Sequence, residues 1–157
     1  MRKNMKNRKT KTFIYKAFGF PIKLINVPMR KVIGEWVIDV DFNELQKAVL
    51  RSLINKPTAL NGAELRFIRK YLHMTTTAFG KIFDVTHAAI SKWESEKSRA
   101  PASADIYIRF YILDHLRVKD KEFHNLFNTI SPGSLAKYRG KTFSPISINI
   151  DEDLKSA

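Results

Sequence analysis

Residues 72–97 read LHMTTTAFGKIFDVTHAAISKWESEK, and this stretch is the most informative part of the sequence about the fold. Apolar side chains recur in it at the three- and four-residue spacing of a helix that buries one face. They are Phe79, Ile82, Phe83, Ile90 and Trp93. Asp84, Val85 and Thr86 interrupt this pattern. The stretch therefore predicts a short helix, a tight corner and a second helix that starts at His87.

Hydroxyl side chains stand where each of these helices is expected to begin. Thr75 precedes the first helix and Thr86 precedes the second, and threonine is a favoured N-cap because its oxygen accepts a backbone N–H. Helix N-termini that carry hydroxyls also suit phosphate oxygens. Two short helices joined in this way form a helix-turn-helix, which can place the start of its second helix in the major groove of DNA.

The second helix is expected to have an apolar and a polar face. Ile90 and Trp93 belong to the apolar face and are expected to lie in the core. The outward side chains are then His87, Ala88, Ser91 and Lys92. For His87 two interpretations stay open, an ordinary exposed histidine or a DNA contact.

Small residues are expected where the two helices meet. Ala78 and Gly80 are small enough for a close helix–helix approach, and Val85 is expected to fill the core at the corner.

The composition favours a polyanionic partner. The chain has 157 residues, a net charge of +13 and a pI near 10.0, which is typical of nucleic-acid-binding proteins. There is no apolar run of membrane-spanning length, and the charged N-terminus lacks the apolar segment of a signal peptide. Without cysteine, a thiolate metal site is excluded. We expect a cytoplasmic protein that is not an enzyme and that has no cofactor, no metal and no membrane partner.

Turn signals divide the chain into four parts. Residues 1–11 carry six positive charges and no acid, which predicts either a flexible solvated tail or an arm that contacts the DNA backbone. Residues 12–57 are an expected appendage of three antiparallel strands and a helix. Residues 58–130 are the expected helix-turn-helix domain, and residues 131–157 a C-terminal extension.

Individual elements follow from local patterns. The expected strands are Thr12–Lys16, Ile22–Val27, Trp36–Val40 and Pro145–Ile150. Asp41 and Asn61 each precede a glutamate by three residues, which predicts helix starts there, and the first of these helices should end before Lys56-Pro57. Two further helices are expected over 106–116 and 122–130. The acids at 151–153 are expected to form a solvated tail.

The central motif resembles the Xre type of helix-turn-helix, the fold of phage repressor domains. The residues that carry the resemblance are Leu65 to Arg69, Leu72, Thr75, Thr76, Phe79, Gly80, Val85, Thr86 and Ile90 to Glu94. The sequence departs from the family at two positions, with Asp84 where the corner usually has glycine and Thr76 where the first helix usually has glutamine. Aspartate tolerates the left-handed backbone of such a corner better than most residues.

The resemblance implies roles for particular residues. It implies base reading by His87, Ala88 and Lys92, and backbone contacts from Thr76, Thr86 and Lys97. It also implies a partly buried ion pair between Arg69 and Glu94. The complete set expected to contact DNA is Thr75, Thr76, Thr86, His87, Ala88, Ser91, Lys92, Lys97 and Arg99.

We therefore expect a mainly α protein, with a lambda-repressor-like domain and a small N-terminal antiparallel β element. The expected function is sequence-specific transcriptional repression by a homodimer on double-stranded DNA, in a bacterial or phage-encoded, nucleoid-associated protein. The N-terminal part is also similar, more weakly, to antitoxins of type II toxin–antitoxin systems, which implies a protein toxin as an alternative partner. A third alternative is a charge-driven RNA-binding or nucleoid protein.

Overall fold

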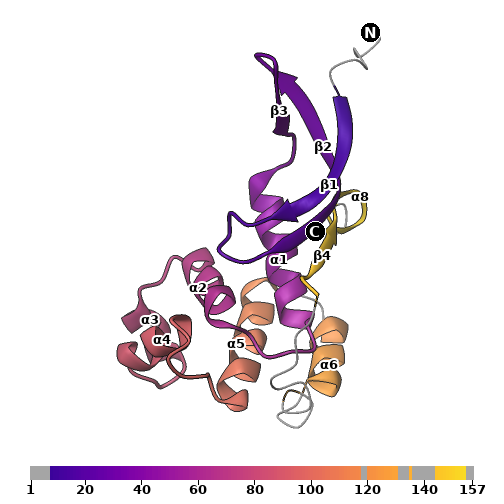
Figure 1. Cartoon of the computed structure of the whole chain (residues 1–157). Coiled ribbons are helices and arrows are strands. Elements are labelled where there is room, and N and C mark those ends of the chain that lie inside the picture. The colour runs from indigo at the N-terminus through magenta and orange to yellow at the C-terminus, as the bar shows by residue number, and fades with distance from the viewer. Residues whose placement is uncertain (1–7, 118–119, 131–134, 136–143, 155–157) are drawn as a thin grey trace. The chain divides into compact units, whose positions relative to one another are not determined.

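The computed structural model describes residues 8–117, 120–130, 135 and 144–154 (Figure 1). The chain divides into two compact units. The sheet unit consists of Met1–Ser52 and Pro145–Ala157, and the helical unit consists of Leu53–Ser144. The protein is rich in helix and has a small mixed sheet. No helix in the described ranges is long and apolar enough to cross a membrane.

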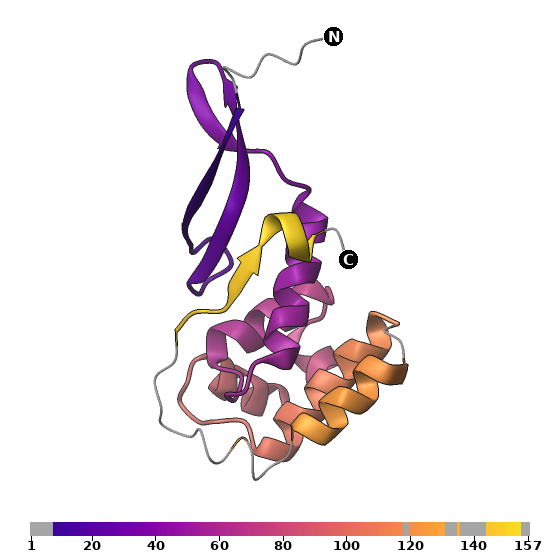
Figure 2. The ribbon, with the colours of Figure 1, turned by 90° about the vertical axis from the view of Figure 1, so that its right-hand side faces the viewer.

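The sheet unit is built around one central strand, β2. β1 pairs with one edge of β2 in antiparallel orientation. On the other edge of β2, β3 pairs antiparallel with Met29–Val32 and β4 pairs in parallel with Lys23–Ile25 (Figure 2). The strands are β1 (Arg8–Tyr15), β2 (Ile22–Val32), β3 (Glu35–Ile38) and β4 (Ser147–Asn149). Helix α1 (Phe42–Asn55) begins in this unit, and the short helix α8 (Ile150–Asp153) follows β4.

The three expected N-terminal strands are present, with different limits. β1 starts at Arg8 rather than Thr12, because Arg8–Lys11 pair with Val27–Arg30 of β2. The prediction of a flexible tail over residues 1–11 is therefore wrong for residues 8–11, and its remainder lies outside the described residues. Alternating Lys and Thr at the start of β1 are typical of an edge strand, whose charged side chains discourage pairing with other chains.

The C-terminal segment corrects two further expectations. Its strand, expected within Pro145–Ile150, forms as β4, but it pairs with β2 in parallel, so the sheet is mixed and not purely antiparallel. Residues 145–157 belong to the sheet unit instead of forming a separate extension. The acids at 151–153 are exposed, as expected, but they lie in α8, where Asn149 caps the backbone N–H of Asp151 at 3.1 Å.

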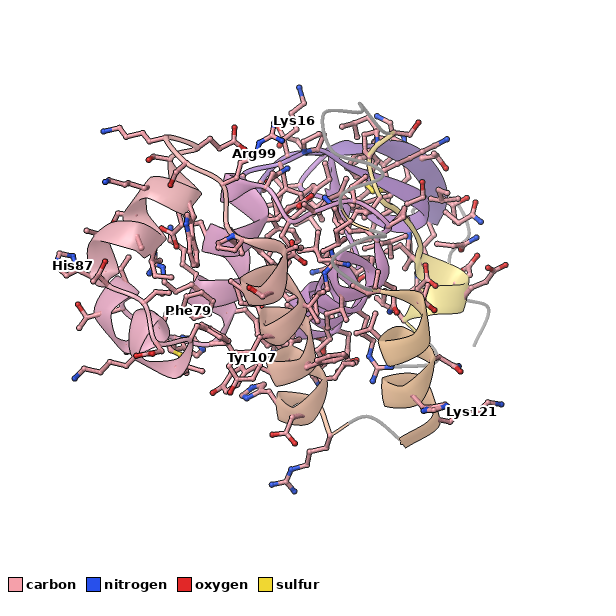
Figure 3. The ribbon with its side chains drawn as sticks, turned by 90° about the horizontal axis from the view of Figure 1, so that it is seen from below. Lys16, Phe79, His87, Arg99, Tyr107 and Lys121 are labelled. Atoms are coloured by element: carbon pink, nitrogen blue, oxygen red, sulfur yellow. The ribbon has the colours of Figure 1, made fainter. Side chains whose placement is uncertain are left out.

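The helical unit contains the end of α1 and five further helices in the described residues. They are α2 (Gly62–Tyr71), α3 (Thr76–Ile82), α4 (His87–Glu94), α5 (Ala102–His115) and α6 (Asp120–Thr129). α5 lies between the α3–α4 pair and α6 (Figures 1 and 3). The buried apolar side chains of α2 to α5 include Leu65, Ile68, Phe79, Ile90, Trp93, Ile108 and Ile112.

Local capping accounts for most helix limits in both units. Oδ1 of Asp41 accepts from the backbone N–H groups of Asn43 and Glu44, and α1 ends at Asn55, before Lys56-Pro57 as expected. Asn61 and Glu64 form the complete reciprocal capping box of α2. The helix expected from Ile106 starts earlier, at Ala102, directly after Pro101, whose carbonyl accepts the backbone N–H of Asp105 at 3.0 Å.

A buried ion pair within α5, which the sequence did not predict, is hydrogen-bonded to the segment before α2. Nε of Arg109 lies 2.7 Å from Oδ1 of Asp105, and only 1% of the Arg109 side chain is exposed. Its other nitrogens donate to the carbonyl oxygens of Ile54, Lys56 and Thr58 at 2.6–2.9 Å. The second oxygen of Asp105 accepts the backbone N–H of Leu60 at 2.7 Å. These bonds satisfy polar groups that would otherwise be buried without partners.

Candidate nucleic-acid interface

The α3–corner–α4 segment has the capping that its threonines predict. Oγ1 of Thr75 accepts the backbone N–H of Ala78 at 3.1 Å, and Oγ1 of Thr86 accepts that of Ala89 at 3.1 Å. Asp84 adopts the left-handed conformation with a φ of 53°, which its short polar side chain tolerates. The corner therefore forms without a glycine at that position.

Gly80 sets the separation between α3 and the corner. The backbone N–H of Val85 donates to the Gly80 carbonyl at 2.9 Å, and a Cβ on Gly80 would lie 2.5 Å from the Val85 carbonyl oxygen. The expected close approach is thus present at Gly80. The expected close approach is absent at Ala78, which is exposed. The prediction that the Val85 side chain fills the core is wrong, because this side chain is only half-buried. The main chain of Val85, and not its side chain, makes the close contact.

One face of α4 is anchored and the other is exposed. Ile90 and Trp93 are buried, as expected from the helical period. The four side chains expected to point outward are all exposed: His87, Ala88, Ser91 and Lys92. Figure 3 shows His87 at the outer end of the helical unit, pointing away from it. α4 is thus held by its inner face while the start of its outer face is open to a ligand.

The capping hydroxyls retain a hydrogen that an anion can accept. A threonine hydroxyl has one donor and two acceptor positions, and capping uses an acceptor position only. The O–H groups of Thr75 and Thr86 remain available to phosphate oxygens next to the positive ends of α3 and α4. Thr76, the first residue of α3, is half-buried.

Two of the predicted contacts lie at the other end of α4. The backbone N–H of Lys97 donates to the carbonyl of Lys92, which places Lys97 just past the end of the helix. Arg99 lies on the segment before α5, well away from His87 (Figure 3). Both side chains are exposed. The structure therefore gathers Thr86, His87 and Ala88 at one end and leaves Lys97 and Arg99 at the other.

The predicted ion pair between Arg69 and Glu94 is present. Nε of Arg69 lies 2.5 Å from Oε1 of Glu94, and Nη2 lies 3.1 Å from Oε2. Nη1 of Arg69 also donates to the carbonyl of Met74, just before α3. The Glu94 side chain is 4% exposed and that of Arg69 is 14% exposed. This bidentate ion pair joins α2 to the end of α4, and Arg69 also hydrogen-bonds to the segment that leads into α3.

Breaking this pair is expected to loosen α4. Arg69→Met leaves the Glu94 carboxylate buried without its main partner and should lower the free energy of unfolding by about 3 kcal/mol. Arg66→Met is the matched control, because Arg66 lies 3.6 Å from the same carboxylate but is half exposed, and it should cost less than about 1 kcal/mol. Urea unfolding of Arg69→Met, Glu94→Gln and the double variant measures the coupling, and strictly additive losses would contradict it.

Other contacts that hold α4 had no clear signal in the sequence. A Cβ on Gly62 would lie 2.4 Å from the carbonyl oxygen of Glu94, and the Gly62 N–H donates to the Glu96 carboxylate at 3.1 Å. An aromatic cluster connects α3 to α5, with the Phe83 ring 5.3 Å from Tyr107 and 5.7 Å from Tyr111. The four-residue spacing of the two tyrosines was the one hint of this cluster.

In the described part of the chain, no three His, Asp or Glu side chains gather closely enough to hold a metal ion. No protein-family model matches the chain, and comparisons with curated proteins and with solved structures found no significant match. A function is therefore inferred from the geometry of α3, α4 and the side chains around them.

Proposed function

We propose that the protein binds DNA in a sequence-specific way, reads the major groove with the exposed face of α4, and represses transcription. The observation that carries this proposal is the pairing of a firmly anchored inner face on α4 with an exposed outer face at its start. Ile90, Trp93 and Glu94 anchor the helix. A helix fits the major groove, where base edges differ for every base pair.

The exposed side chains suit the roles that such a helix needs. Lys92 can donate to guanine acceptors, His87 and Ser91 can hydrogen-bond to base edges, and Ala88 can contact a thymine methyl group. The hydroxyls of Thr75 and Thr86 suit the flanking phosphates. The net charge of +13 favours association with DNA at any sequence and so assists the search for a specific site.

A homodimer is part of the proposal. α4 has eight residues, and its exposed start reaches few base pairs. Two copies related by a two-fold axis would double the site and bind half-sites about 34 Å apart. Co-purification of a small protein with the full chain would instead favour the antitoxin alternative.

The proposal is tested by selecting bound duplexes from a random pool and measuring variants on the selected site. His87→Ala and Lys92→Ala should each weaken specific binding by about 1–3 kcal/mol and change binding to unrelated duplexes less. His124→Ala and Lys121→Ala are matched controls, because both side chains are exposed on α6, and Lys121 lies at the opposite end of the helical unit from His87 (Figure 3).

Two outcomes would contradict the proposal. If selection enriches no sequence, the protein binds by charge alone. Alternatively, His87→Ala and Lys92→Ala could change specific and non-specific binding equally, which would mean that α4 does not read bases.

A further inference from the structure

The sheet unit carries a dense set of positive charges that the proposed role of α4 does not use. Residues 8–34 contain seven cations and no acid, and all seven cationic side chains are exposed. They are Arg8, Lys9, Lys11, Lys16, Lys23, Arg30 and Lys31, and we call them the basic ribbon. Among the described residues, Asp39 is the one carboxylate within ion-pair distance of the ribbon, at 3.4 Å from Arg30.

The cations lie on both faces of the ribbon near its β2–β3 end. Arg8 is directly opposite Arg30, and residues that pair directly across antiparallel strands share a face. Lys9 is opposite Met29, and Lys31 is opposite Trp36, so these residues lie on the other face. Nζ of Lys9 lies 4.1 Å from the centre of the Trp36 ring, which supports this assignment.

This arrangement costs stability in the isolated protein. Like charges directly opposite each other on a sheet, such as Arg8 and Arg30, destabilise it. A ribbon that is positive on both faces fits a polyanion that contacts both, and β-ribbons of DNA-binding proteins enter the major or the minor groove of the duplex, between its phosphate walls.

The turn between β2 and β3 has a second feature that lowers the stability of the protein. Ile33 is 99% exposed and adopts a φ of 48°, and Gly34 follows with a φ of 83°. Two successive positive φ values are typical of a tight hairpin turn that favours Asn-Gly, and a β-branched residue is strained there. Figures 1 and 2 show this turn at the opposite end of the sheet from β4. An exposed, strained apolar residue at the tip of a basic ribbon suits a wedge that packs against bases or sugars.

We propose that the basic ribbon is a second nucleic-acid-binding surface, which holds the backbone of duplex DNA without sequence preference and places Ile33 against the groove. The inference goes beyond base reading by α4 and does not require it. Charge complementarity selects this occupant, because the seven exposed cations outnumber the two neighbouring acids, Glu35 in β3 and Asp39 just after it. An anionic membrane shares the charge but offers no groove for a ribbon that is positive on both faces.

The test compares two full-length variants that each lose one arginine and one lysine. Arg8→Gln with Lys31→Gln removes two ribbon charges, and Arg117→Gln with Lys121→Gln removes two exposed charges of the helical unit. Affinity for a duplex of random sequence is measured against salt concentration. Each lost phosphate contact lowers the slope of log K against log salt by about 1, so the ribbon variant should lose about 2 and the control should keep the wild-type slope.

A third variant separates binding from folding at the tip. Ile33→Asn places a residue that tolerates positive φ in the turn, so it should raise the melting temperature of the protein. If Ile33 contacts DNA, the same change should weaken duplex binding at all sequences alike. A purely structural role for Ile33 would leave affinity unchanged or improve it, and that result would overturn the wedge.

The outcomes distinguish this inference from the function of α4. A slope that falls for the ribbon variant and not for the control supports the inference, even if selection enriches no specific sequence. Equal slopes for both variants would overturn it while leaving specific binding by α4 intact. Binding of the wild-type chain to phosphatidylserine vesicles, lost in the ribbon variant while duplex binding is unchanged, would also overturn it and assign the ribbon to a membrane surface.

Discussion

Replacing Arg109 with methionine is expected to lower the free energy of unfolding of the helical unit by about 3–5 kcal/mol. The guanidinium is almost completely buried, and it pairs with Asp105 while donating to the carbonyls of Ile54, Lys56 and Thr58. Methionine fills a similar volume but provides no donor. It therefore leaves a buried carboxylate and three carbonyl groups without their present partner.

The measurement uses the fluorescence of Trp93, which is buried in the helical unit. In a Trp36→Phe background it is the one tryptophan left in the chain, so urea unfolding reports on this unit. Arg117→Met is the matched control, since Arg117 is exposed just after α5, and it should cost little. Arg109→Lys should recover only a small part of the loss, because an ammonium group cannot reproduce the planar fork of donors. A loss below 1 kcal/mol for Arg109→Met would show that the buried network does not hold α5 to this segment.

The second large effect is expected from a single added carbon atom at Gly62. A Cβ there would lie 2.4 Å from the Glu94 carbonyl oxygen and 2.7 Å from that of Trp93. Both contacts are with backbone atoms at the end of α4, so no side chain can rotate away. We expect Gly62→Ala to cost about 3 kcal/mol, at the upper end of the usual range for overpacking, although alanine ordinarily stabilises a helix relative to glycine.

The control for this substitution is Gly34→Ala in the sheet unit. Nothing lies within 4 Å of a Cβ at Gly34, and its φ of 83° alone should cost about 1–2 kcal/mol. Because Gly34 is in the other unit, its replacement should leave the Trp93 transition unchanged. If Gly62→Ala raised the urea midpoint of that transition, α2 and α4 would not be in the close contact that the structure shows. Since the same contact positions α4, Gly62→Ala should also weaken binding to a selected DNA site.

The parts of the fold that obey local rules were predictable from the sequence. Caps at Asn61, Thr75 and Thr86 each follow from a side chain that accepts a backbone N–H three residues later. The exposed and buried faces of α4 follow from the helical period. The left-handed corner at Asp84 and the Arg69–Glu94 pair were expected from a resemblance, and both are present in the structure.

Contacts between distant segments were not predictable in the same way. The parallel pairing of β4 with β2 joins residues that lie 124 positions apart in the sequence, such as Lys23 and Ser147. An alternating pattern of three residues predicts a strand but does not predict which strand it pairs with. The spacing of Asp105 and Arg109 suggests an ordinary surface pair one helical turn apart, and only the packing of the 54–60 segment over them reveals their burial. Val85 was misjudged because a corner can be held by its main chain as well as by a side chain.

The pairing of β4 with β2 also has a consequence for the order in which the protein forms during synthesis. β2 leaves the ribosome early, but its parallel neighbour is made only after the whole helical unit has been translated. The helical unit is continuous in sequence, so it can fold while the chain is still growing. The sheet unit must wait for its last strand and must then close a long loop, which is slow for contacts of this kind. During that interval one edge of β2 lacks its partner strand β4. The positive charges around β2 help to keep this edge from pairing with other nascent chains.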